Sequence, residues 1–89
     1  MIRIIYSKHF LRETKKFPTN IQTKLAEQLE LLQQNPFHSF LHTKSLTGRL
    51  AGFYSFRITR DWRVIFQFKK PEIIKLIGIG HRKDIYKEK

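Results

Sequence analysis

The sequence predicts an α+β fold in which a helix hairpin packs on one face of a small antiparallel β-sheet, with the element order β-α-α-β-β-β. Two observations support this prediction. Apolar residues recur at helical spacing through residues 8–34, whereas residues 52–68 alternate between apolar and polar side chains, as in two strands joined by a short turn. At 89 residues the chain is expected to form a single domain, 1–89, whose active site would be an open groove.

One strand and two helices are expected in the first 36 residues. Residues 2–6 form an apolar run that suits a strand, and Ser7 can cap the helix that follows. Pro18 ends this first helix, and Thr19 with Gln22 has the spacing of a capping box at the start of the second. Each helix carries one apolar stripe, formed by Phe10, Leu11, Thr14 and Phe17 in the first and by Ile21, Leu25, Leu29 and Leu32 in the second.

Residues 37–50 lack a clear period and are expected to form a loop. His38 and His42 in this segment have a spacing that could bind a metal ion from one helix. No acidic or cysteine ligand lies near them in the sequence to complete such a site. We therefore expect neither a metal nor a cofactor.

The register of the hairpin follows from parity, because successive side chains of a strand point to opposite faces. A three-residue turn at 59–61 sets Ile58 opposite Trp62 and Arg57 opposite Arg63. Both strands then keep one apolar face, and the two arginines share the other face, where they are solvated or bind an anion. The run at 72–79 is apolar on both faces and predicts a central strand, after which Gly80 begins a polar tail.

Eighteen Lys and Arg residues against seven Asp and Glu give a formal charge of +11, which favours a polyanionic partner. The absence of cysteine excludes disulfides and cysteine-ligated zinc. The N-terminal apolar run is too short for a signal peptide, and no segment reaches membrane-spanning length. We expect a cytoplasmic protein that does not associate with membranes.

Four segments together resemble the RelE/ParE toxin superfamily: KSLTG at 44–48, FYSFRI at 53–58, DWRVIFQF at 61–68 and IGIGHRKDIY at 77–86. Within it, the sequence is more similar to RelE than to ParE. The resemblance implies a RelE-like domain and the toxin of a type II toxin–antitoxin system. Its expected activity is ribosome-dependent cleavage of messenger RNA in the A site, and its expected partner is a cognate antitoxin.

The resemblance also implies roles for individual residues. Arg57, Arg63, Arg82 and Tyr86 fall at the positions of RelE's strand lysine, second-strand arginine, tail arginine and catalytic tyrosine. Two positions depart from the pattern, because Ser55 and His81 each stand where RelE has a lysine. The predicted catalytic residues are thus Arg57, Arg63, His81, Arg82 and Tyr86, and the predicted RNA-binding residues are Lys44, Arg49, Arg60 and Lys83.

RNA can be cut without metal when its own 2′-hydroxyl attacks the adjacent phosphorus, a reaction that needs a base, an acid and cations. Arginine forks suit the phosphate oxygens. A tyrosine among positive charges can serve as a phenolate base, and His81 is an alternative acid or base. Two other functions stay open at this point, a ParE-like toxin that inhibits DNA gyrase without cutting RNA and a basic nucleic-acid-binding module.

Overall fold

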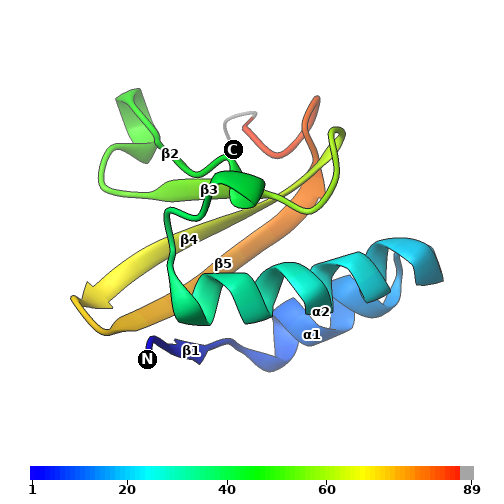
Figure 1. Ribbon diagram of the computed structural model, residues 1–89. Helices are drawn as coiled ribbons and strands as arrows, with labels where there is room; N and C mark the ends of the chain where they lie inside the picture. The colour runs from blue at the N-terminus through cyan, green and yellow to red at the C-terminus, as the bar shows by residue number, and fades with distance from the viewer. Residues whose placement is uncertain (87–89) are drawn as a thin grey trace.

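The computed structural model describes residues 1–86, so the last three residues of the predicted domain lie outside the described part. Two helices lie side by side along one face of a sheet (Figure 1). After the second helix the chain crosses to the far edge of the sheet, and the long hairpin follows. The elements, with short 3-10 helices labelled η, are β1 (Arg3–Ile5), α1 (Lys8–Lys15), α2 (Thr19–Gln34), η1 (Ser39–Leu41), β2 (Lys44–Ser45), η2 (Gly48–Leu50), β3 (Tyr54–Arg57), β4 (Trp62–Lys70) and β5 (Ile73–His81).

The sheet has five strands in the order β1-β5-β4-β3-β2, and the predicted α+β fold class is confirmed. Two details differ from the expectation. β2 is an additional strand within the predicted loop. The sequence did not predict it, because a strand of two residues is too short to show an alternating pattern. β1 pairs with β5 in parallel, while all the other pairs are antiparallel. The predicted central position of the last strand is confirmed, because β5 lies between β1 and β4.

The two helices begin differently. Ser7 caps α1 as predicted, with its Oγ accepting from the backbone N–H of Phe10 at 3.1 Å. The capping box at Thr19 is wrong, because Thr19 is already helical and Pro18 occupies the cap without a side-chain hydrogen bond. The amide of Gln22 instead donates to the carbonyl of Phe17 at 2.8 Å, which ties α2 to the end of α1.

A single apolar core fills the space between the helices and the sheet. Val64 and Phe66 are fully buried, and the partly buried Trp62 packs its ring 4.8 Å from that of Phe17, so the predicted inner face of β4 is confirmed. The predicted place of Leu11 in the helix stripe is wrong, since this side chain is 42% exposed. The core comprises Phe10, Ile21, Leu25, Leu32, Leu41, Phe56, Ile58, Val64, Phe66, Ile74 and Leu76.

The hairpin has the predicted register. Phe56 lies opposite Val64 and Arg57 opposite Arg63, and the N–H of Ile58 donates to the carbonyl of Trp62 at 2.8 Å. Since Phe56 and Val64 point into the core, both arginines point to the sheet face that turns away from the helices.

The chain after β5 turns back over that same face. The backbone N–H groups of Asp84 and Ile85 both donate to the carbonyl of His81 at 2.9 Å. The side chain of Ile85 lies 3.6 Å from the place that a Cβ on Gly80 would occupy, and Gly80 is paired with Arg63. Within residues 1–86, neither helix is long and apolar enough to cross a membrane.

Candidate functional site

The sheet face that turns away from the helices, here called the arginine face, carries Ser55 and Arg57 on β3 and Arg63 on β4. Ser55 is buried, Arg63 is 9% exposed and Arg57 is partly buried. Arg63 donates through Nη2 to the carbonyl of Arg60 at 3.3 Å, whereas the Nε atoms of Arg57 and Arg63 are buried without a hydrogen-bond partner in the described structure. A buried donor without a partner is costly, so this face is prepared for an anion.

Tyr86 is brought onto the arginine face by the returning tail. Its hydroxyl donates to Ser55 Oγ at 3.0 Å, and the Nζ atom of Lys44 lies 5.8 Å from the centre of its ring. Lys44 is paired directly with Ser55 across β2 and β3, so the short strand β2 is what places this ammonium group. The sequence departs from the RelE pattern at position 55, and a lysine from the neighbouring strand supplies a positive charge beside the tyrosine.

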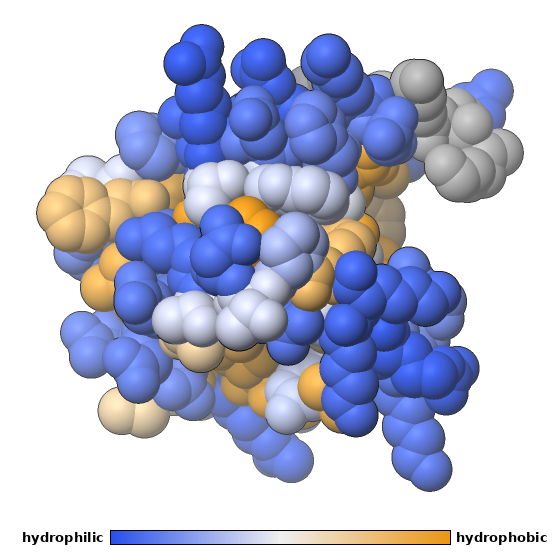
Figure 2. All heavy atoms as spheres, turned by 90° about the vertical axis from the view of Figure 1, so that its right-hand side faces the viewer, coloured by the Kyte–Doolittle hydropathy of each residue, from blue (hydrophilic) through white to orange (hydrophobic). Residues whose placement is uncertain are grey.

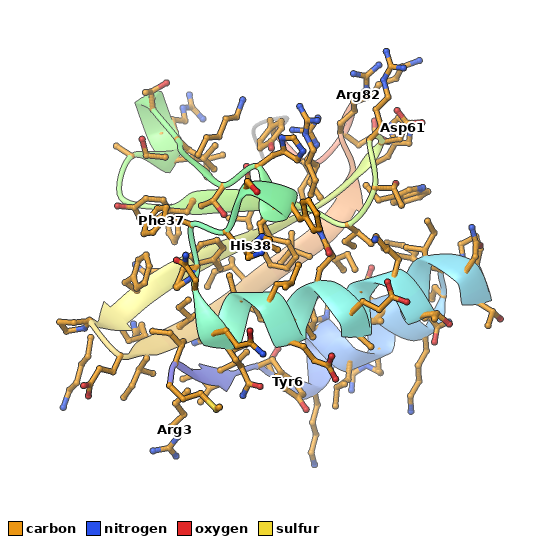
Figure 3. The ribbon with its side chains drawn as sticks, viewed as in Figure 1. Arg3, Tyr6, Phe37, His38, Asp61 and Arg82 are labelled. Atoms are coloured by element: carbon orange, nitrogen blue, oxygen red, sulfur yellow. The ribbon has the colours of Figure 1, made fainter. Side chains whose placement is uncertain are left out.

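Arg82 lies at the hairpin end of the sheet, next to Asp61 (Figure 3). Its Nε atom is 3.3 Å from Asp61 Oδ1, and its backbone N–H donates to the carbonyl of Asp61 at 2.7 Å. The two side chains are 43% and 52% exposed, and an ion pair this exposed contributes about 0–1 kcal/mol. Arg82 can therefore exchange Asp61 for a phosphate at little cost.

His81 does not join the other predicted catalytic residues. It is paired with Trp62, whose ring lies 5.3 Å away, whereas its neighbour Gly80 is the residue opposite Arg63. His81 therefore lies on the helix side of the sheet. Its Nδ1 accepts the backbone N–H of Lys83 at 3.1 Å, which uses one imidazole nitrogen to shape the tail.

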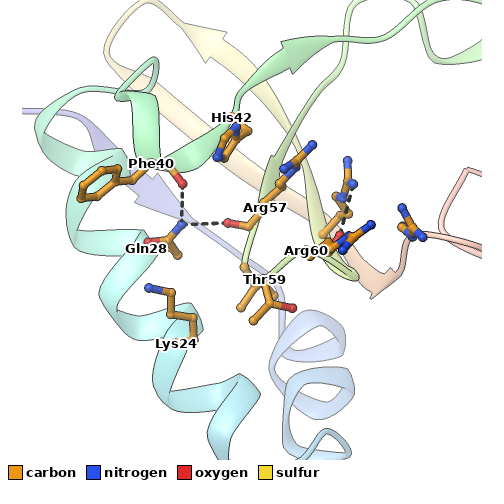
Figure 4. Close-up of a pocket in the computed structure, with 10 residues that line it drawn as sticks. Lys24, Gln28, Phe40, His42, Arg57, Thr59 and Arg60 are labelled. Carbon is orange, nitrogen blue, oxygen red and sulfur yellow. Dashed lines mark hydrogen bonds between the residues drawn. The ribbon is translucent and has the colours of Figure 1, made fainter.

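A groove of about 520 Å³ opens at the hairpin end of β3, between the sheet and α2 (Figure 4). Its basic lining comes from distant parts of the chain: Lys24, His42, Arg57, Arg60, Arg63 and Arg82. Figure 2, which views the molecule from this end, shows a mostly hydrophilic surface with small apolar patches. Four predicted arginines thus line one groove, the catalytic candidates Arg57, Arg63 and Arg82 and the RNA-binding candidate Arg60. Tyr86 lies beside a smaller hollow that Lys44 also lines.

Sequence reasoning missed Lys24, Gln28 and His42 in this groove. Gln28 had a signal, because it is a polar residue on the apolar stripe between Leu25 and Leu32, and it is 3% exposed. Its amide donates to the carbonyls of Phe40 and Arg57 at 3.1 and 2.9 Å (Figure 4). A buried amide that bridges two elements in this way fixes one wall of the groove.

The remaining predicted residues lie outside the groove. Arg49 is exposed on η2, and Lys83 is exposed in the tail. His38 accepts the N–H of Phe40 through Nδ1 at 3.0 Å and so caps η1. Among residues 1–86, no three His, Cys, Asp or Glu side chains are grouped as a metal site would require.

The arrangement combines fixed cations with a phenolic hydroxyl on an open surface. No Asp or Glu side chain from residues 1–86 lines either the groove or the hollow beside Tyr86. Such a surface can hold a phosphodiester through arginine forks and present one proton-transfer group to it.

Three solved structures illustrate the shared fold. YafQ from Escherichia coli strain BL21(DE3) has a TM-score of 0.77 at 19% identity, over 98% of this chain and 100% of that one. The toxin–antitoxin complex RelBE2 from Mycobacterium tuberculosis gives 0.75 at 20%, over 91% and 98%. The YoeB-YefM complex from Staphylococcus aureus gives 0.72 at 22%, over 89% and 94%.

The search of curated proteins finds no match to this sequence. A family model described as the ParE toxin of the type II toxin–antitoxin system parDE matches residues 4–86. This match spans nearly all of the chain, and the helices, sheet and tail all fall within it. The chain therefore belongs to the ParE toxin family and is a type II toxin of the RelE/ParE superfamily.

Proposed function

We propose that this toxin is a metal-independent endonuclease that cuts messenger RNA in the A site of the ribosome. The observation that supports this most is the contact between Tyr86 and Ser55 on the arginine face. Ser55 and Arg57 are two residues apart on β3 and so share a face, about 7 Å from each other along the strand. A proton-transfer group and phosphate-binding groups therefore lie close together on one face of the sheet.

In the proposed reaction, the 2′-hydroxyl oxygen attacks the adjacent phosphorus. The O2′–P bond forms and the P–O5′ bond breaks, which leaves a 2′,3′-cyclic phosphate and a 5′-hydroxyl end. Tyr86, as a phenolate, takes the proton of the 2′-hydroxyl, and solvent protonates the leaving 5′-oxygen. The hydroxyl of Ser55 can accept from the phenol or donate to the phenolate, so both forms of Tyr86 keep a hydrogen bond.

Arg57 and Arg63 stabilise the charge that develops on the phosphate oxygens, and Arg82 adds a third guanidinium from the tail. Arg57 and Arg63 lie on paired positions of adjacent strands, so their charges are held in place before the substrate arrives. Like charges on directly opposed residues destabilise a sheet by up to about 1 kcal/mol, and a bound phosphate offsets that repulsion.

Two partners belong to this proposal. Similar solved structures include toxins in complex with YefM and with RelB, which supports a cognate antitoxin here. We propose that acidic side chains of this antitoxin cover the arginine face and that the free toxin acts on cytoplasmic ribosomes. Co-expression with the cognate antitoxin should relieve toxicity and give a complex that copurifies.

Inhibition of DNA gyrase is the second candidate, and the observation that favours it is the match to the ParE family model. Inhibition of gyrase requires no proton-transfer group. A variant that lacks the hydroxyl of Tyr86 therefore distinguishes the two candidate functions.

The test uses the Tyr86→Phe variant on programmed ribosomes. Loss of the phenol should lower the cleavage rate by about 100-fold or more, the effect of losing one preorganised catalytic group. Tyr6→Phe is the matched control, because Tyr6 is exposed at the opposite end of the molecule from Arg82 (Figure 3). Mass spectrometry of the products should show the cyclic phosphate. Gyrase poisoning by a fully toxic Tyr86→Phe protein would refute the nuclease and support the second candidate.

A further inference from the structure

The groove at the hairpin end of β3 extends the cationic surface well beyond the groups that the proposed chemistry needs. Arg57 and Arg63 belong both to the arginine face and to the groove lining. From them the lining continues around the edge of β3 to Arg60, His42 and finally Lys24 on α2 (Figure 4). The surface is thus continuous from the proposed cleavage point to the helix layer.

This groove exists because β2 is short. β2 pairs only with Tyr54 and Ser55, so the edge of β3 at Arg57 has no strand beside it. The amide of Gln28 occupies that edge and bonds the carbonyls of Arg57 and Phe40, which closes the edge to a further strand. A chain that binds here must therefore do so through its own charged groups and not by β-pairing.

The positive charge in the groove is only weakly neutralised. Lys24 Nζ lies 3.5 Å from Glu27 Oε1, but the two side chains are 46% and 62% exposed, so the pair is weak. Arg82 has a similarly exposed partner in Asp61. The Nε atoms of Arg57 and Arg63 have none among the described residues. Donors that are already desolvated and positioned bind an anion at low additional cost.

We infer that this groove binds the RNA backbone beside the cleaved phosphodiester, with Lys24 and Arg60 as contacts to at least one flanking phosphate. This inference rests on the proposed function, because the cleavage point defines where the groove begins. The ligand is a single-stranded phosphodiester chain, and the contacts are to phosphates and carry no base preference. An acidic protein segment is the rival occupant.

The experiment compares two double variants that each remove two positive charges. Lys24→Met with Arg60→Met alters the groove, and Lys69→Met with Lys70→Met alters exposed residues at the other end of β4. Binding is measured with fluorescent 2′-O-methyl oligonucleotides of increasing length, which cannot be cut, over a series of salt concentrations. Each phosphate contact to a single strand contributes about 0.7 to the slope of log K against log salt.

The groove variant should lose roughly 0.7 to 1.4 of that slope, for one or two lost phosphate contacts, and should no longer gain affinity when the oligonucleotide is lengthened past the cleavage point. The control should keep the wild-type slope and length dependence. Indistinguishable variants, or a wild type without measurable affinity for RNA, would overturn the inference. Loss of binding to an acidic peptide but not to RNA in the groove variant would assign the groove to the rival occupant.

A cleavage assay on ribosomes distinguishes failure of the proposed nuclease activity from failure of the groove assignment. A protein that binds RNA in the groove but cuts no messenger RNA would refute the nuclease and leave the groove assignment intact. If instead the groove variant cuts with the KM and kcat of the control, the nuclease stands and the groove assignment fails.

Discussion

The two faces of the sheet differ in what they do for the protein, although β4 contributes to both. Its inward residues Val64 and Phe66 are fully buried against the helices, whereas its outward Arg63 is nearly buried with an Nε atom that has no described partner. The inner face stabilises the fold through apolar burial. The outer face holds a charge at some cost to stability, which is a common feature of functional sites.

Phe66→Ala should have the largest effect on the inner face. It leaves a cavity in a closely packed core and should lower the free energy of unfolding by about 3–5 kcal/mol. Chemical denaturation measures this loss. Ile77→Ala is the control, since Ile77 is 40% exposed on the neighbouring strand β5. Equal losses in the two variants would contradict the assignment of the core to the helix side.

Arg63→Met should produce the opposite pattern on the outer face. Methionine keeps an apolar stem and removes a guanidinium whose Nε lacks a partner, so stability should stay the same or rise. Cleavage should fall by about 100-fold or more. Arg3→Met, at an exposed arginine of β1, should change neither quantity. A strongly destabilised Arg63→Met protein would show that the arginine is structural.

His81→Ala should give the smallest effect. Because His81 packs against Trp62 on the helix side, the variant should lose about 0.5–1.5 kcal/mol of stability and little cleavage activity. Parallel denaturation and cleavage assays measure both quantities. A folded but inactive variant would return the acid–base role to the imidazole and break the division between the two faces.

The position of His81 also marks where sequence reasoning stops. Counting by twos from Ile74 and Leu76 would put His81 on the arginine face, with Tyr86. The register shifts between Ile65 and Phe66, where β5 carries one additional residue, Ile77. A bulge of this kind moves every later side chain of the strand to the opposite face of the sheet. The bulge depends on how β5 pairs with β4, which cannot be read from the local alternation of residues in β5.

Other features could be predicted because they are local. The alternation of apolar and polar residues in β3 and β4 was enough to predict the hairpin register, because only one register keeps both arginines out of the core. The groove could not be predicted, because Lys24 and His42 reach Arg57 only through the packing of α2 and η1 on the sheet. Tyr86 was assigned through a family resemblance, and its contact with Ser55 depends on the path of the tail.

The position of β5 between β1 and β4 has a consequence for the order of folding. β5 lies near the C-terminal end of the described chain and pairs with β1 near its N-terminal end, so neither β1 nor the free edge of β4 has a partner until β5 has been synthesised. Such long-range pairing is slow to form. The tail that carries Arg82 and Tyr86 follows β5 directly. A nascent chain that ends before β5 therefore lacks both the completed sheet and the proposed active site.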